Sequence, residues 1–176
     1  AMRSNDPRFA MKTGGAIPPL YTPEQRRLRD STPWTLVQGI LDPVQFLIFL
    51  VSLVLVLRFL ATGEGAAAAT LSVVAKTIAL YLIMITGSIW EKAVFGKYLF
   101  APAFFWEDVV SFGVIALHTA YLVCLFTGWL DSRDLLILAL AAYATYVINA
   151  AQFLLKLRAA RLSQDSKGFG GMEAAS

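Results

Sequence analysis

Residues 90–108 read WEKAVFGKYLFAPAFFWED, and this stretch decides the fold because it separates two apolar runs that are each long enough to cross a bilayer. It holds five charged residues among many aromatic ones. Ionisable side chains at or near membrane depth are costly, so they are candidates for a functional site. The acidic residues of the stretch are Glu91, Glu107 and Asp108, and we predict that they lie close to the membrane boundary.

Two further apolar runs flank this pair, and the spans are expected at about residues 37–60, 67–90, 105–127 and 134–157. The chain has 176 residues, of which 57% are hydrophobic and only 15% are charged. A soluble domain carries about 25% charged residues, so the composition indicates an integral membrane protein. The predicted fold is all-α, a four-transmembrane-helix bundle formed by one domain over residues 20–162. Disordered tails are expected at residues 1–19 and 163–176.

Lysine and arginine residues flank the four spans unequally. They gather before the first span, after the fourth span and in residues 90–108. The positive-inside rule therefore places both termini and this connection in the cytoplasm. All four tryptophans fall at predicted span ends, as in an aromatic belt. These charges and contact with anionic lipid explain the net charge of +3, and nothing indicates nucleic-acid binding.

Polar residues recur inside the spans at helical spacing, so that several share one helix face. The stripes are Gln38, Asp42, Gln45 and Ser52 in the first span, Glu107, Ser111 and His118 in the third, and Asn149 and Lys156, with Tyr146 and Gln152 beside them, in the fourth. If the stripes face one another, they form a polar pocket that opens towards the cytoplasmic leaflet. The pocket would then be deepest near His118.

Each of these polar residues also has a structural explanation. Glutamine and asparagine often join helices in membrane bundles, and Lys76 in the second span can pair with a carboxylate or extend towards the interface. Asp42 precedes Pro43 and can adjust the helix there. A carboxylate at the membrane rim can be ordinary surface, and a buried histidine can serve as a structural hydrogen-bonding group. The combined pattern still favours a functional site, because several buried polar groups are costly in so small a bundle.

The common catalytic motifs are missing from the sequence. It contains no HExxH, CxxC, GxSxG or glycine-rich phosphate-binding motif. A single histidine excludes bis-histidine haem ligation within one chain, and the single Cys124 excludes an intramolecular disulfide. General acid–base chemistry by the carboxylates and His118 is therefore the chemistry that these residues offer.

Several stretches of the chain resemble the 3-vinyl bacteriochlorophyllide hydratases of bacteriochlorophyll biosynthesis. The WEK and FFWED elements around YLFAPA carry the most specific part of this likeness. The similar segments are residues 20–41, 43–65, 86–111, 116–122 and 141–162. The resemblance implies addition of water to the C3-vinyl group of chlorophyllide a or 3-vinyl bacteriochlorophyllide a, which gives a 3-(1-hydroxyethyl) group. It also implies a multi-pass protein of the bacterial inner membrane that requires no cofactor, since magnesium is part of the substrate macrocycle.

This implied reaction needs an acid that remains protonated near neutral pH. Protonation of the terminal vinyl carbon leaves a cation that the macrocycle delocalises, and water then attacks the ring-attached carbon. Burial raises the pKa of a carboxylic acid, and a neighbouring carboxylate raises that pKa further. We expect Glu107 or Asp108 to be the acid, and the other members of the cluster, Glu91 included, to orient the water as base. His118 is expected to ligate the substrate's magnesium axially or to transfer protons.

The substrate is expected to contact polar and aromatic side chains from all four spans and from the 90–108 stretch. The residues predicted to bind it are Gln38, Asp42, Gln45, Trp90, Lys92, Tyr98, Phe105, Trp106, Ser111, Asn149 and Gln152. Lys92, Lys97 or the arginines at positions 26, 27 and 29 are candidates to hold the substrate's propionate. The expected partners are this pigment and membrane lipid, with a homo-oligomer or contact with neighbouring pathway enzymes permitted by small-residue stripes.

Two alternatives remain open from the residues alone. A non-catalytic pigment-binding or assembly subunit would need the pocket and His118 but not the carboxylates. A small proton-coupled transporter protomer would use Lys76, Asp42 and His118 as a path through the membrane. Four spans are few for a transporter, so that alternative would require an oligomer.

Overall fold

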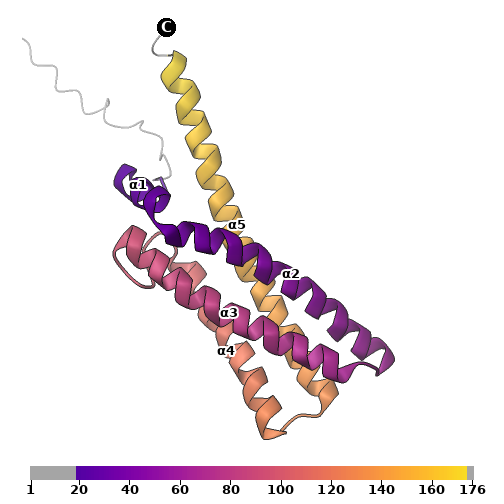
Figure 1. The fold of residues 1–176 in the computed structure, drawn as a ribbon. Helices are drawn as coiled ribbons and strands as arrows, with labels where there is room; N and C mark the ends of the chain where they lie inside the picture. The colour runs from indigo at the N-terminus through magenta and orange to yellow at the C-terminus, as the bar shows by residue number, and fades with distance from the viewer. Residues whose placement is uncertain (1–18, 174–176) are drawn as a thin grey trace, which may run out of the picture.

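The computed structural model describes residues 19–173 and places their side chains as far as residue 165. This part of the chain folds into helices joined by short connections (Figure 1). The helices are α1 (Pro23–Ser31), α2 (Pro33–Thr62), α3 (Ala66–Phe95), α4 (Phe105–Thr127) and α5 (Ser132–Glu173). Helices α2 to α5 are long and apolar enough to cross a membrane. The prediction of an all-α protein with four candidate spans is therefore confirmed, while residues 1–18 and 174–176 lie outside the described part.

Glycines end three of the membrane helices. Gly63, Gly96 and Gly128 follow α2, α3 and α4 with φ angles of 74°, 80° and 68°. This left-handed conformation is accessible to glycine at little cost, and it turns the chain out of the helix after the last apolar turns. The connection between α3 and α4 begins at Gly96, so this residue sets the start of the segment that carries the site.

Helix α1 was not among the predicted elements, although the sequence contains its start signal. Thr22 and Gln25 form a capping box, in which the Gln25 backbone N–H donates to Thr22 Oγ1 at 3.1 Å and the Thr22 backbone N–H donates to Gln25 Oε1 at 2.9 Å. Pro23 occupies the first helical position, where its missing N–H costs nothing. The Thr-Pro-Glu-Gln run thus starts a short amphipathic helix before the first span.

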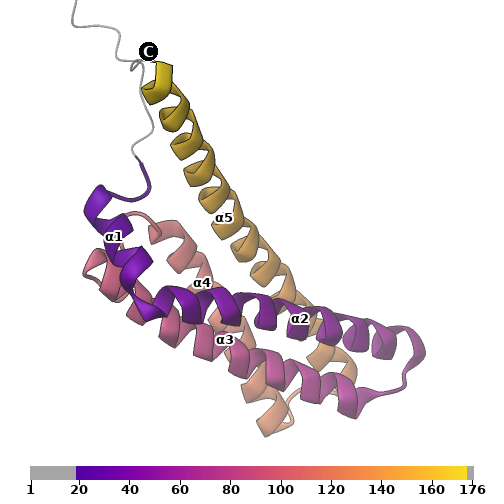
Figure 2. The same cartoon turned by 45° about the horizontal axis from the view of Figure 1, so that its top comes forward.

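Helix α5 differs most from its predicted bounds. It continues through residues 163–173, where a disordered tail was expected. Its 42 residues correspond to a length of about 63 Å, roughly twice the thickness of the bilayer's hydrocarbon core. The C-terminal part of α5 extends away from the other helices in both views (Figures 1 and 2). The preceding residues 153–162, which read FLLKLRAARL, favour a helix, and α5 continues from them through residues 163–173, whose three glycines give no sign of a helix.

The four long helices form two antiparallel hairpins that cross each other (Figures 1 and 2). Helix α2 packs along α3 and helix α4 along α5, while contacts between the hairpins are less extensive. Near the α2–α3 connection the core contains Phe49, Val56, Val73, Tyr121 and Tyr143, which come from all four helices. Many large apolar side chains outside this core are exposed, as expected for surfaces that face lipid.

A second, smaller core lies at the opposite end of the bundle. Tyr21, Val94 and Phe104 are buried there, and Trp90 and Phe95 pack against them. The Tyr21 and Phe95 rings stack with centroids 5.8 Å apart, which anchors the segment before α1 to the end of α3. This second core supports the α3–α4 connection and the acidic residues beside it.

Candidate active site

Three carboxyl groups converge where α3 ends and α4 begins. Glu91 lies in the last turns of α3, and Glu107 and Asp108 lie in the first turn of α4. All three side chains are buried. The two helix ends return to the same side of the bundle, because residues 96–104 form a short connection between antiparallel helices. The structure therefore brings together the three residues that the sequence proposed as acid and base.

Glu91 and Asp108 form a pair within this cluster. Both side chains are buried, they accept hydrogen bonds from the neighbouring residues Ala101 and Phe100, and they interact electrostatically with each other. An ionised carboxylate only accepts hydrogen bonds, so two carboxyl groups can bond to each other only when one of them carries a proton. Two buried neighbouring carboxylates repel each other, so the site favours a proton on one of the pair, and a protonated carboxyl group is what a general acid requires.

The same two carboxyl groups hold the connection between the helices. Asp108 Oδ2 accepts a hydrogen bond from the Phe100 backbone N–H at 2.8 Å, and Glu91 Oε2 accepts one from the Ala101 backbone N–H at 3.3 Å. Phe100 has a φ angle of 58°, which is the left-handed conformation that costs a non-glycine residue about 1–2 kcal/mol. The carboxyl pair and the strained connection thus depend on each other.

Glu107 has a different partner from the other two carboxyl groups. Its Oε2 atom lies 2.8 Å from Lys156 Nζ, which forms an ion pair between α4 and α5. The Lys156 ammonium also donates to the Ala103 carbonyl oxygen in the connection. The Glu107 side chain is 8% exposed and that of Lys156 is 31% exposed. The buried carboxylate therefore depends on the positive charge of this lysine to offset its loss of hydration. Glu107 is therefore the member of the cluster that is ion-paired with a cation.

Polar side chains continue the site along α4 and α5. Ser111 Oγ donates to Asn149 Oδ1 at 3.0 Å, and Asn149 Nδ2 donates to the Glu107 carbonyl oxygen at 2.9 Å. Gln152 Oε1 lies 3.5 Å from the same amide nitrogen. These contacts bring the predicted stripes of the third and fourth spans together beneath the carboxylates.

The polar residues of the first span lie apart from this cluster. Gln38 Nε2 donates to Thr86 Oγ1 at 2.6 Å, which joins α2 to α3. Gln45 is buried, whereas Asp42 is exposed on α2. Within the described residues, none of these three first-span side chains has a hydrogen bond to Glu91, Glu107 or Asp108.

His118 and Lys76 form a separate buried centre deeper in the bundle. His118 Nδ1 donates to the Val114 carbonyl oxygen at 2.8 Å, and Lys76 Nζ lies 3.6 Å above the Tyr146 ring. Both side chains are fully buried, and among the described residues His118 Nε2 and Lys76 Nζ have no hydrogen-bond partner. His118 follows Glu107 by eleven residues, or about 16 Å along α4. The polar residues thus form two centres at different depths.

Of the four aromatic residues predicted to bind the substrate, one packs against other rings and three are exposed. Trp90 packs against Phe95 and Phe104 with ring centroids 5.8 Å apart in each case, and its Nε1 donates to Thr35 Oγ1 at 2.9 Å. Tyr98, Phe105 and Trp106 are exposed. Lys92 lies beside them, with its Nζ 5.4 Å from the Tyr98 ring centroid and bonded to the Gly96 carbonyl oxygen.

Three residues of the site were not among the predicted site residues. Lys156 belongs to the polar stripe of the fourth span, and its spacing from Asn149 was the available signal. Phe100 and Phe112 stack on each other with ring centroids 5.4 Å apart. Phe112 follows Phe105 by seven residues, which is a helical spacing, but no sequence signal indicates the left-handed backbone of Phe100.

No group of three or more histidine, cysteine, aspartate or glutamate side chains that could hold a metal ion occurs within the described residues. The site thus consists of a buried pair of carboxyl groups, a carboxylate that is ion-paired with a lysine, and neutral hydrogen-bonding groups. Such a set can donate a proton, stabilise positive charge and orient a water molecule.

Comparison with known proteins gives a consistent result over nearly the whole folded chain. Residues 21–159 match the family described as 2-vinyl bacteriochlorophyllide hydratase. A relative of that name from Rhodobacter capsulatus is 70% identical over 151 residues, which cover 86% of this chain and 88% of the relative. Another, from Cereibacter sphaeroides, is 70% identical over 147 residues, which cover 84% and 91%. No solved structure matches the chain. The chain therefore belongs to the 2-vinyl bacteriochlorophyllide hydratase family of bacteriochlorophyll biosynthesis, and it is a hydratase.

Proposed function

We propose that the protein adds water to the C3-vinyl group of chlorophyllide a or 3-vinyl bacteriochlorophyllide a and forms the 3-(1-hydroxyethyl) product. The locant 2 in the family description follows the older numbering of the macrocycle, in which this carbon is C2. The observation that supports the mechanism is the buried Glu91–Asp108 pair, whose two carboxyl groups hold the α3–α4 connection, beside Glu107 with its lysine.

The first step of the proposed reaction is proton transfer from the Glu91–Asp108 pair to the terminal carbon of the vinyl group. The π electrons of the vinyl bond form the new C–H bond, and positive charge develops on the carbon attached to the ring. The macrocycle delocalises this charge. The pair gains a negative charge in the same step, so it stabilises the cation electrostatically in a buried site.

The second step is the attack of water on the ring-attached carbon. A lone pair of the water oxygen forms the C–O bond, and the proton that the water loses returns to the Glu91–Asp108 pair. Glu107 is available to orient this water, because its second carboxylate oxygen is not the one bonded to Lys156. The sum of both steps is the addition of one water molecule, and the pair regains its starting protonation state without a redox cofactor.

His118 is not part of this proposed mechanism. Its free Nε2 and its backbone-bonded Nδ1 are typical of a histidine that can ligate a metal. It is fully buried, however, and lies about 16 Å along α4 from Glu107. We therefore propose that the substrate's magnesium stays near the α3–α4 connection, and loss of pigment binding in H118A with an intact fold would reverse this assignment.

We further propose that both termini and the α3–α4 connection face the cytoplasm of the bacterial inner membrane. The distribution of lysine and arginine supports this orientation through the positive-inside rule. Reporter domains fused to either end, or cysteine accessibility at exposed Lys97 compared with exposed Glu64, would test it. Labelling of position 64 but not position 97 from the cytoplasmic side would contradict it.

The activity itself is tested by anaerobic incubation of the purified protein with chlorophyllide a, followed by absorbance and mass. Hydration removes the vinyl group from conjugation, so the red absorption band should move to shorter wavelength as the pigment gains the mass of one water. In deuterium oxide, the label should appear in the new methyl group. Bound pigment of unchanged mass, with both the chlorin and the bacteriochlorin substrate, would contradict the proposal and favour a non-catalytic carrier.

A further inference from the structure

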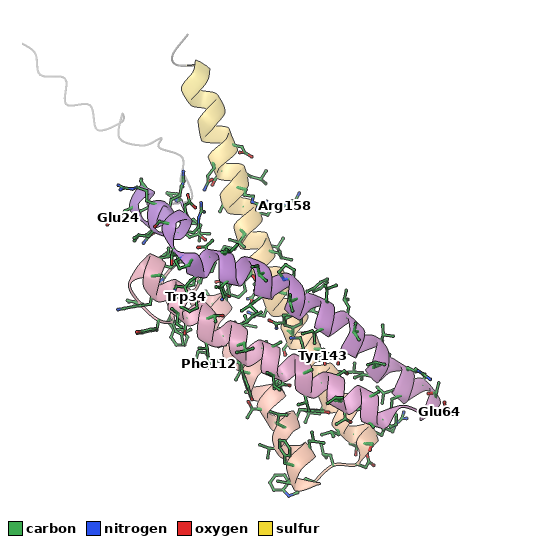
Figure 3. The ribbon with its side chains drawn as sticks, in the orientation of Figure 1. Glu24, Trp34, Glu64, Phe112, Tyr143 and Arg158 are labelled. Carbon is green, nitrogen blue, oxygen red and sulfur yellow. The ribbon has the colours of Figure 1, made fainter. Side chains whose placement is uncertain are left out.

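Three phenylalanine rings form a continuous surface on the outside of the bundle beside the carboxyl pair. We call Phe100, Phe105 and Phe112 the aromatic platform. The Phe100 ring stacks on Phe112 with centroids 5.4 Å apart and planes 13° apart, and it lies 5.7 Å from the Phe105 ring. The three side chains are 38%, 42% and 42% exposed. Figure 3 shows Phe112 at the outer side of the bundle, so the platform faces the bilayer.

The backbone of Phe100 distinguishes this platform from an ordinary lipid-facing surface. Acyl chains accept apolar side chains in many orientations, so contact with lipid does not require a strained residue. Phe100 nevertheless adopts the left-handed conformation, and the Asp108 carboxylate holds it there through the backbone N–H. Strained backbone that the surroundings fix in place is typical of functional sites.

The platform is directly linked to the proposed acid. The amide of Phe100 bonds to Asp108 and that of Ala101 to Glu91, so one short segment carries a platform ring and contacts both members of the carboxyl pair. A flat molecule lying on the platform would therefore have its edge next to the connection that covers the pair. This continuity with the proposed site is the second observation that sets the platform apart.

A positive charge lies in the same connection as the platform, three residues before Phe100. Lys97 is exposed in the same connection, and it has no carboxylate partner among the described residues. The exposed Tyr98 ring lies next to it in the chain. An apolar aromatic surface with an exposed cation in the same connection matches an apolar, planar ligand that carries one carboxylate.

We infer that the aromatic platform is the surface on which the planar macrocycle docks from the bilayer, with its propionate on Lys97, before its vinyl group reaches the Glu91–Asp108 pair. This inference rests on the proposed function, because the macrocycle with one ionised propionate is the substrate proposed above. It assigns ring binding to Phe100, Phe105 and Phe112, and it assigns no proton transfer to them.

The test is pigment binding to the full-length protein in lipid nanodiscs, with chlorophyllide a as the probe and quenching of tryptophan fluorescence as the readout. We expect F105A and F112A to raise the apparent Kd about tenfold each, since aromatic contacts of this kind contribute energies of that order. F126A is the matched control, because Phe126 is 79% exposed at the opposite end of α4. K97E should weaken pigment binding, whereas K97R should bind the pigment like the wild type. The methyl ester of the pigment has no free carboxylate, so it should bind equally to the wild type, K97E and K97R.

The outcomes separate this inference from the proposed function. If F105A and F112A bind the pigment no more weakly than F126A, the platform only contacts lipid and the inference fails, even if the wild type hydrates the pigment. If the double variant F105A/F112A converts a dimer to a monomer at unchanged affinity, the surface binds a second copy and the inference also fails. If binding falls as expected but the wild type does not hydrate the pigment, the docking surface stands and the proposed function fails.

Discussion

Replacement of Lys156 by methionine should destabilise the protein through the carboxylate that it leaves behind. The change removes the ion pair to Glu107 and the hydrogen bond to the Ala103 carbonyl oxygen, but it keeps most of the apolar length of the side chain. Removing one partner of a buried ion pair costs about 3–5 kcal/mol, because the other charge stays buried without compensation.

The structure places the expected cost at the lower end of that range. Glu107 is almost fully buried, but the Lys156 side chain is 31% exposed, so water partly screens the pair. That cost includes the lost hydrogen bond to the Ala103 carbonyl oxygen, which alone contributes about 1 kcal/mol. We therefore expect K156M to lower the free energy of unfolding by about 3 kcal/mol, measured by reversible unfolding in mixed micelles.

The double variant K156M/E107Q provides the decisive comparison. The amide removes the uncompensated charge, so it should recover at least about 1 kcal/mol of the loss caused by K156M. E107Q alone should be destabilising, because it leaves the ammonium without its carboxylate. A K156M protein within about 0.5 kcal/mol of the wild type, or a double variant no more stable than K156M, would refute the assignment of Glu107 as an ionised, lysine-dependent carboxylate.

Three further predictions follow from particular contacts, each measured by unfolding in the same micelles. G96A should lower stability by about 1–2 kcal/mol, because an alanine Cβ meets no atom within 4 Å there and the cost comes only from the left-handed backbone. G113A, in the interior of α4, should raise stability or leave it unchanged. Equal effects of the two changes would contradict this prediction. K76M should raise stability by about 1 kcal/mol or more, because it removes a buried amino group that has no hydrogen bond, and this gain exceeds the loss of the contact between Nζ and the Tyr146 ring; a marked loss would indicate a partner for this lysine. N149L should cost about 2 kcal/mol, because it removes the amide that bonds Ser111 and the Glu107 carbonyl oxygen; an unchanged midpoint would show that these bonds do not hold α4 to α5.

The membrane helices were predictable because the thickness of the bilayer fixes the length of an apolar run. The convergence of Glu91, Glu107 and Asp108 was predictable for a related reason. Two antiparallel helices joined by a short connection return their ends to one side, and all three residues lie at those ends. Helix α1 could also have been predicted, since its Thr22 capping box is visible in the sequence.

The different partners of the three carboxyl groups could not be predicted from the sequence in the same way. Which carboxyl group pairs with which partner depends on the path of residues 96–104, and this path depends on a left-handed Phe100 that no propensity would suggest. Helical spacing correctly placed Ser111 and Asn149 on facing sides of α4 and α5. Spacing does not reveal what lies between two polar residues on one face. The buried Val114 separates Ser111 from His118 along α4, and the Tyr143 ring packs 5.8 Å from the His118 ring.

The proton on the Glu91–Asp108 pair is the centre of this account. Its most direct test is the single-turnover rate at which chlorophyllide a gains the mass of one water, compared among the wild type, E91Q and D108N. E64Q serves as the control, because Glu64 lies in the α2–α3 connection at the opposite end of the bundle. We predict a loss of at least about 100-fold in E91Q and D108N, as expected for removal of a general acid, and no loss in E64Q. Wild-type rates in both E91Q and D108N would contradict the account.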